Sequence, residues 1–218
     1  LDALSSHGGA STIKFFGGEP SISMSTRMEI ADRLDFSYSD LDGLTVYLDA
    51  GHGYNSSNNG VYDGGASGSG YSEAELTKEL ANLVADELRA YGVAVHVNDY
   101  GGWYKLRQAE AERLGCDLFV SIHFNATGFG GASGSETYIH SYNAAWRSDV
   151  LQDRVHPALV SSIHLSDRGQ HQEEFAVLNG NVPAVLCEVC FIDNYSDMQA
   201  YQAYKYDIAR SIAESIAL

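Results

Sequence analysis

The sequence predicts an α/β fold: a single domain with a twisted, mostly parallel sheet flanked by helices on both faces. From residue 44 onwards, short apolar stretches alternate with longer ones whose apolar residues recur every three to four positions, as strands alternating with helices do. The stretch DLFVSIH (117–123) is almost continuously apolar, which indicates a strand that helices cover on both faces of a parallel sheet.

The first elements are the clearest. In LTVYLD (44–49), apolar residues alternate with others, which predicts a strand. A glycine-rich loop follows, and then a helix from Glu73 to Tyr91, with Leu76, Leu80 and Leu88 on its buried face and Gly92 after its last turn. The remaining predicted strands are 93–97, 117–123, 135–141, 175–179 and 183–192, and the remaining helices are 104–115, 145–164 and 198–218.

Residues 1–43 have a different composition from the rest. They begin with a Ser/Gly-rich stretch that lacks the basic and apolar regions of a signal peptide, and 21–34 has the pattern of a short helix. We expect an N-terminal extension or linker at 1–43, dispensable for the chemistry, and one functional domain at 44–218.

Composition excludes several classes of protein. The 218 residues carry a net charge of −16, which a phosphate backbone would repel, so we expect no nucleic-acid partner. No apolar run reaches the ~18 residues that a membrane span needs, so we expect no membrane-spanning segment. The cysteines Cys116, Cys187 and Cys190 lie in apolar contexts and are predicted to be reduced and buried; a zinc knuckle or redox pair at CEVC is the alternative.

Two histidines follow predicted strands directly. His52 stands between glycines after the first strand, and His123 ends the apolar strand before another Gly-rich loop. In an open α/β sheet, working residues lie beyond the carboxyl ends of the strands, so these two imidazoles indicate a metal site. A solvated turn histidine and a core histidine are the alternatives. The other six histidines lack this context and are interpreted as structural or exposed: His7, His96, His140, His156, His164 and His171.

A catalytic zinc takes a third protein ligand and keeps one open position. Glu73 begins the helix after the glycine-rich loop, so its side chain can turn back toward the strand edge, whereas Glu75 and Glu79 are expected to face solvent. A carboxylate at this position is also favoured by the helix dipole. The spacing alone leaves ligand and capping residue as alternatives for Glu73.

Glu188 interrupts the strongly apolar strand VLCEVCFI. A carboxylate there is costly unless it is paired or bound, which makes Glu188 a candidate functional residue. The alternative is a structural ion pair with a buried arginine such as Arg107 or Arg168.

Residues 44–218 resemble the zinc-dependent N-acetylmuramoyl-L-alanine amidases (amidase type 3) of bacterial autolysins and phage endolysins. Ala50 stands where the family often has proline, a change that the backbone tolerates. The matching stretches, in the family's order, are LDAGHG (48–53), YSEAELTKELANLVADEL (71–88), DLFVSIHFNA (117–126), RGQHQEEFAVLN (168–179) and PAVLCEVCFIDN (183–194).

This resemblance implies the chemistry and the roles. The family's zinc ligands fall on His52, Glu73 and His123, and its essential glutamate falls on Glu188. One Zn²⁺ per chain would activate a water that hydrolyses the amide between N-acetylmuramic acid and L-alanine of peptidoglycan, with Glu188 as acid–base residue.

Asn125 and Arg168 are further candidate site residues, which would contact the substrate or support the metal ligands from behind.

A peptidoglycan substrate implies a secreted or wall-associated bacterial enzyme, or a phage lysin. The alternative functions are a zinc hydrolase acting on another cell-wall amide, such as a deacetylase, and an inactive peptidoglycan-binding module. The sequence does not determine the oligomeric state.

Overall fold

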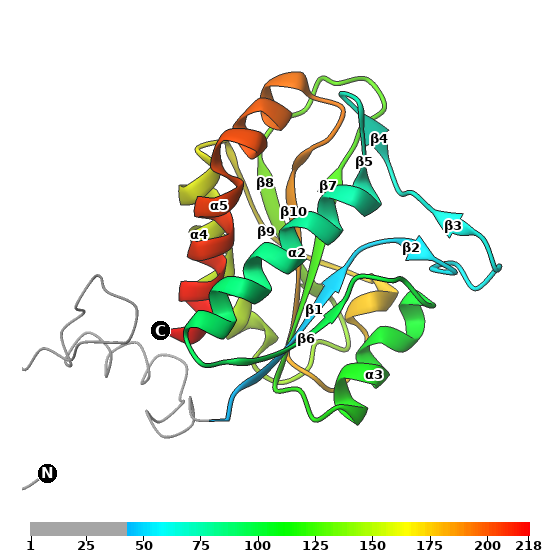
Figure 1. Ribbon diagram of the computed structural model, residues 1–218, viewed down its shortest axis with the longest axis vertical. Coiled ribbons are helices and arrows are strands. Elements are labelled where there is room, and N and C mark those ends of the chain that lie inside the picture. The colour runs from blue at the N-terminus through cyan, green and yellow to red at the C-terminus, as the bar shows by residue number, and fades with distance from the viewer. Residues whose placement is uncertain (1–42) are drawn as a thin grey trace, which may run out of the picture. The chain divides into compact units, whose positions relative to one another are not determined.

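The computed structural model describes residues 43–218, so the helix predicted within 21–34 lies outside the described part of the chain. Its central feature is a six-stranded sheet in the order β6-β1-β7-β10-β8-β9 (Figure 1). Neighbouring strands are parallel except for β10 and β8. The strands of the sheet are β1 (Thr45–Ala50), β6 (Ala94–Asn98), β7 (Leu118–Asn125), β8 (Ser135–His140), β9 (Asp167–Glu173) and β10 (Ala184–Phe191).

Helices cover both faces of this sheet, which confirms the predicted fold class. On one face α2 and α4 both pack against α5 (Figure 1). On the other face α3 and η2 cover a core in which the rings of Tyr47 and Phe119 stack with centroids 5.3 Å apart. The helices are α2 (Glu73–Ala90), α3 (Arg107–Arg113), α4 (Ser148–Ile163) and α5 (Tyr195–Ala217), with 3₁₀ turns η1 (Tyr104–Leu106) and η2 (Ala176–Leu178). No helix within residues 43–218 is long and apolar enough to cross a membrane.

The strand predicted at 175–179 is wrong. This segment forms the 3₁₀ turn η2, and the strand precedes it as β9. The reason is that β9 lies at the edge of the sheet, where its sequence DRGQHQE stays mostly exposed and lacks an apolar pattern. Val177 and Leu178 are apolar because they fill the core beneath α3, where no strand ladder is needed.

The glycine-rich loop between β1 and α2 contains more structure than its composition indicates. It forms two short antiparallel hairpins, β2 (Gly53–Tyr54) with β3 (Tyr62–Asp63) and β4 (Ser67–Gly68) with β5 (Tyr71–Ser72). Two-residue strands carry too few side chains to give an alternating pattern, so only the structure reveals them. They extend from the body of the domain beside the carboxyl end of β1 (Figure 1).

All three cysteines are free and buried, as predicted. Burial raises the pKa of the Cys187 thiol to about 12, and the Cys190 thiol pKa is also raised well above its usual value. Both side chains are therefore inert apolar packing groups.

We expect Cys190→Ala to lower the free energy of unfolding by about 1–2 kcal/mol, because it leaves a small cavity in a core where Cys190 is fully buried. Denaturant unfolding followed by circular dichroism measures this loss. Unchanged stability would contradict the packing role. The same change at Cys116, which is 8% exposed, is expected to cost less.

Candidate metal centre and catalytic cleft

The candidate site lies at the edge of the sheet where β1, β7 and β10 end. Parallel strands present their carboxyl ends at the same edge, and β8 contributes its amino end because it runs antiparallel to β10. In the register of the sheet, Glu188 on β10 stands between His123 on β7 and Glu136 on β8. The topology therefore brings residues far apart in sequence into one row.

His52 occupies the turn directly after β1. Its backbone has a φ of 68°, a left-handed conformation that costs a residue other than glycine about 1–2 kcal/mol. Buried Arg107 holds the turn, because its guanidinium donates to the carboxylate of Asp49 at 2.7 Å and to the carbonyl of His52 at 2.6 Å. Thr77 of α2 donates its hydroxyl proton to the Gly51 carbonyl at 2.9 Å. These contacts define the direction of the imidazole.

Two glycines in this region are required by close packing. A Cβ atom on Gly51 would lie 2.4 Å from the imidazole of His123, so this glycine leaves room for the second histidine. Gly65 has a φ of 67°, and a Cβ there would lie 2.6 Å from Oε2 of Glu73. Any larger residue would displace one of the three candidate ligands.

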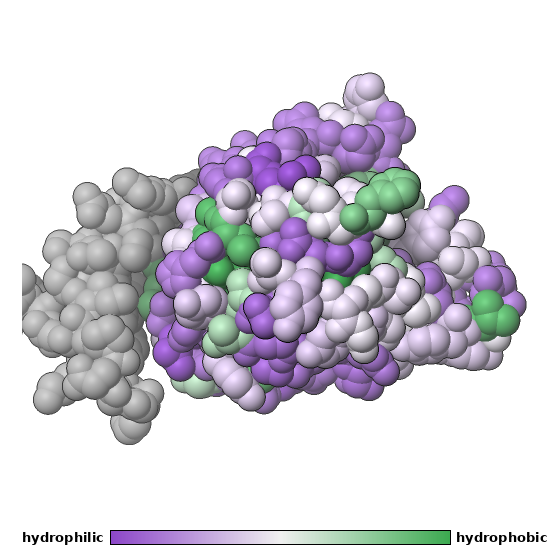
Figure 2. All heavy atoms as spheres, turned by 90° about the horizontal axis from the view of Figure 1, so that it is seen from above, coloured by the Kyte–Doolittle hydropathy of each residue, from purple (hydrophilic) through white to green (hydrophobic). Residues whose placement is uncertain are grey.

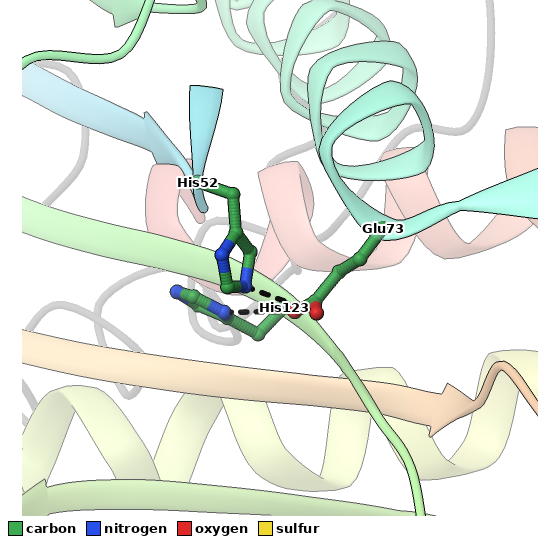
Figure 3. Close-up of side chains that lie close together, drawn as sticks. All are labelled: His52, Glu73 and His123. Carbon is green, nitrogen blue, oxygen red and sulfur yellow. Dashed lines mark hydrogen bonds and ion pairs between the residues drawn. The ribbon is translucent and has the colours of Figure 1, made fainter. Parts of the chain in front are cut away.

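The carboxylate of Glu73 faces both histidines and contacts one with each of its oxygens (Figure 3). Oε2 is 3.0 Å from Nε2 of His52, and Oε1 is 2.9 Å from Nδ1 of His123. The backbone amides of Ala66 and Phe124 donate to the same two oxygens. Glu73 therefore turns away from the start of its helix and toward the strand edge, whereas Glu75 faces solvent and Glu79 is half-buried against Tyr201 and Lys205.

Electrostatics stabilise the ionised form of this carboxylate. Burial opposes the charge on Glu73, but the hydrogen bonds and charges of His123 and His52 outweigh it and hold the Glu73 pKa below its usual range. For His52, burial favours the neutral ring, but the carboxylates of Glu73 and Asp63 outweigh it and raise the His52 pKa.

The donor set fits a metal ion. One ligand atom from each of His52, Glu73 and His123 lies within 4.8 Å of the other two, which is a possible metal-binding group within residues 43–218. Two imidazole nitrogens and one carboxylate oxygen are ligand types that Zn²⁺ takes in catalytic sites. The side chains of His52 and His123 stay 23% and 17% exposed, so the group is reachable from solvent.

Asp63 is a member of the site that sequence reasoning missed. Its Oδ2 lies 3.1 Å from Nδ1 of His52, and its Oδ1 accepts the backbone proton of Gly65 at 3.0 Å. This contact occupies the nitrogen of His52 that points away from Glu73. The only sequence signal for the role of Asp63 is that it is an acidic residue within the glycine-rich loop. The position of Asp63 depends on the pairing of β2 with β3.

The two arginines considered as ion-pair partners of Glu188 pair elsewhere, so that alternative is wrong for both. Arg107 pairs with Asp49, and Arg168 pairs with Glu136 at 3.0 Å. Oε2 of Glu188 is shielded from solvent and has no hydrogen-bond partner among the described residues. Burial, followed by the negative charges of Glu73 and Glu136, raises the Glu188 pKa well above its usual value. A carboxyl group whose oxygen has no competing partner is suited to exchange a proton with a bound reactant.

Asn125 and Arg168 both contact Glu136 rather than the candidate ligands. Asn125 donates its amide proton to Oε1 of Glu136 at 2.5 Å, and Arg168 donates from Nε to Oε2. His171, interpreted above as structural or exposed, lies 3.6 Å from the same carboxylate. These residues form a second polar group on the far side of Glu188.

The other histidines lie away from the site. His156 is buried against Asp167 and Thr137, whereas His96 and His164 are exposed; His7 lies outside the described residues.

Comparison with known proteins places this geometry in a family. The family model for N-acetylmuramoyl-L-alanine amidase matches residues 46–218. Among solved structures, an N-acetylmuramoyl-L-alanine amidase from Clostridium difficile 630 superposes with a TM-score of 0.71 at 29% identity, covering 80% of this chain and 95% of that one. The catalytic domain of the amidase CwlV from Bacillus (Paenibacillus) polymyxa var. colistinus gives a TM-score of 0.68 at 28% identity, covering 79% and 96%.

Curated relatives differ in length. The uncharacterized protein YqiI of Bacillus subtilis is 36% identical over 76% of this chain and 79% of its own length. The endolysin of Bacillus phage SPP1 is 36% identical over 79% of this chain and 64% of its own length. The amidase LytC of Bacillus subtilis is 34% identical over 78% of this chain, which corresponds to only 34% of LytC. By the extent of these matches, the chain belongs to the N-acetylmuramoyl-L-alanine amidase family.

Proposed function

We propose that this protein is a zinc-dependent amidase that hydrolyses the bond between N-acetylmuramic acid and L-alanine in peptidoglycan. The observation that carries the proposal is the row of groups at the carboxyl ends of the strands. It consists of a cluster of two histidines and a glutamate, with Glu188 on the next strand, whose buried Oε2 has no hydrogen-bond partner within residues 43–218. Membership of the family supports the choice of bond.

His52, Glu73 and His123 would hold the zinc ion. Bound there, it would supply a Lewis acid that polarises the scissile carbonyl and lowers the pKa of a water molecule toward ~7. The chain itself contributes the orientation of the ligands. Arg107 and Thr77 hold the backbone of the His52 turn, Asp63 orients the ring, and two backbone amides hold the Glu73 carboxylate.

Glu188 would move the proton. In this role it accepts the proton of the attacking water and delivers it to the nitrogen of the leaving L-alanine, so that the amine departs as a neutral group. General acid–base catalysis of this kind contributes ~10²–10⁴-fold to a rate. Within residues 43–218 no donor is bonded to Oε2, so no protein group competes for that oxygen.

All of these groups lie between residues 52 and 188, so we propose that residues 44–218 carry the whole of the chemistry. The substrate is part of the bacterial wall. The protein would therefore act outside the cytoplasm as a secreted or wall-associated enzyme, or on the host wall as a phage lysin.

Digestion of purified peptidoglycan tests this function. We expect new amino groups on L-alanine, no new reducing sugar ends and no released acetate. A protein treated with a chelator should lose the activity and regain it with Zn²⁺. Acetate release without alanine amino groups would establish a deacetylase instead, and binding without any new chain end would establish an inactive wall-binding module.

We expect Asp63→Ala to weaken zinc binding by about 10–100-fold, because loss of a hydrogen-bond partner that orients a metal-bound histidine has this effect in other proteins. The contact at stake is the 3.1 Å approach between Asp63 and His52. Competition with a coloured chelator measures the affinity. Asp86→Ala, which changes an exposed aspartate on α2, is the matched control, and equal affinities of the two variants would contradict the role of Asp63.

A further inference from the structure

We infer that the substrate crosses the site in one direction, with its saccharide on the β6–β1 side and its peptide on the β8–β9 side. This inference rests on the proposed function and adds the position of each half of the substrate. It follows from the order of the strands, from the place of Glu188 in that order, and from the side chains on the two sides of the metal centre.

The order of the strands defines two sides of the metal centre. His52 follows β1 and His123 lies on β7, whereas Glu188 lies on β10, one strand further along. A residue that delivers a proton to the leaving nitrogen must come within hydrogen-bond reach of it. The L-alanine nitrogen and the peptide beyond it therefore lie toward β10 and β8. The acyl half of the bond, which carries the muramic acid, then extends toward β1 and β6.

A cavity lies on the side assigned to the saccharide. It has a volume of about 220 Å³, and its walls include His52, Tyr62 of β3, Lys78 of α2, and Asp99 and Tyr100 after β6. The two tyrosines remain 60% and 59% exposed. A tyrosine ring offers an apolar surface for the C–H face of a pyranose, and its hydroxyl group remains free for hydrogen bonds.

Polar groups complete the cavity. Lys78 and Asp99 form an ion pair at 3.4 Å, which provides a donor and an acceptor for sugar hydroxyl groups. The face of the molecule seen in Figure 2 is mostly hydrophilic, with hydrophobic residues scattered over it. A few aromatic walls with a small number of placed polar groups are characteristic of pockets for small polar ligands.

The β8–β9 side of the metal centre is suited to a carboxylate. Arg168 is 37% exposed; its Nε is bonded to Glu136, and its guanidinium packs over the ring of Phe191 at 4.8 Å. Among the described residues, the two terminal amino groups of this guanidinium have no hydrogen-bond partner. They lie in one plane, the geometry that binds carboxylates bidentately. A stem peptide carries carboxylates, whereas a neutral N-acetylated sugar ring carries none.

Binding of one probe for each half of the substrate tests the direction. The probes are the neutral disaccharide N,N′-diacetylchitobiose, which carries no carboxylate, and the dipeptide L-alanyl-D-glutamate, titrated into the zinc-loaded full chain and followed by calorimetry. We expect the double variant Tyr62→Ala, Tyr100→Ala to weaken disaccharide binding by about tenfold or more and to leave dipeptide binding unchanged. Arg168→Gln should weaken dipeptide binding by about tenfold or more and leave the disaccharide unaffected.

Tyr142→Ala is the matched control. Tyr142 is 80% exposed and follows the carboxyl end of β8, which lies at the opposite edge of the sheet from the site, so both affinities should match those of the unmodified protein. Exchanged effects of the two variants would overturn the inference, and so would an unmodified protein that does not bind the disaccharide. If peptidoglycan digestion releases L-alanine amino groups but the effects are exchanged, only the direction is wrong; if digestion releases none, the proposed function itself fails.

Discussion

We expect Glu188→Gln to abolish peptidoglycan hydrolysis while the fold and the zinc content stay unchanged. Glutamine has the same shape and still forms hydrogen bonds, but it cannot accept a proton from water. If Glu188 is the acid–base residue, the rate should therefore fall by ~10²-fold or more. Release of alanine amino groups from peptidoglycan measures the rate, and elemental analysis of the purified variant measures the zinc.

Glu136→Gln is the matched control for this experiment. Glu136 stands beside Glu188 in the register of the sheet, but its two oxygens are already bonded to Asn125 and Arg168. We expect a smaller loss of rate there than at Glu188. Loss of zinc from Glu188→Gln would mean that Glu188 is a ligand, and a greater loss of rate in Glu136→Gln would assign the acid–base role to Glu136.

We expect Glu73→Ala to lose zinc and activity together. Glu73 would be the only carboxylate among the three ligands, and its removal leaves two histidines, one ligand fewer than catalytic zinc sites usually have. The loss of affinity should exceed the ~10–100-fold expected from a residue behind the ligands, such as Asp63. Chelator competition measures the affinity, and circular dichroism establishes that the variant is folded.

Glu75→Ala is the matched control, because it removes a carboxylate two residues away on the exposed side of the same helix. Its zinc content and activity should equal those of the unmodified protein. If both variants keep their zinc, the assignment of Glu73 as ligand is wrong. If Glu75→Ala alone loses it, the helix register inferred from Leu76 and Leu80 is wrong.

Much of this architecture is encoded locally in the sequence. The apolar face of α2 repeats with the period of a helix, and the buried strand β7 is almost continuously apolar, so both elements were predictable. The same patterns place His52 and His123 after strands, and they make Glu188 conspicuous as a carboxylate within an apolar strand. Sequence patterns can therefore predict the position of a residue whose surroundings are determined by its own strand or helix.

Only the tertiary structure decided which residues meet. The edge strand β9 has a polar sequence because none of its residues is buried, so its ladder with β8 leaves no periodic signal. Three contacts join segments that come together only on folding. They are the contact of Asp63 with His52, the hydrogen bond of Arg107 to the His52 carbonyl, and the ion pair of Arg168 with Glu136. A charged side chain has no period along the chain, and its partner depends on distances in space, so these contacts could not be derived from sequence patterns alone.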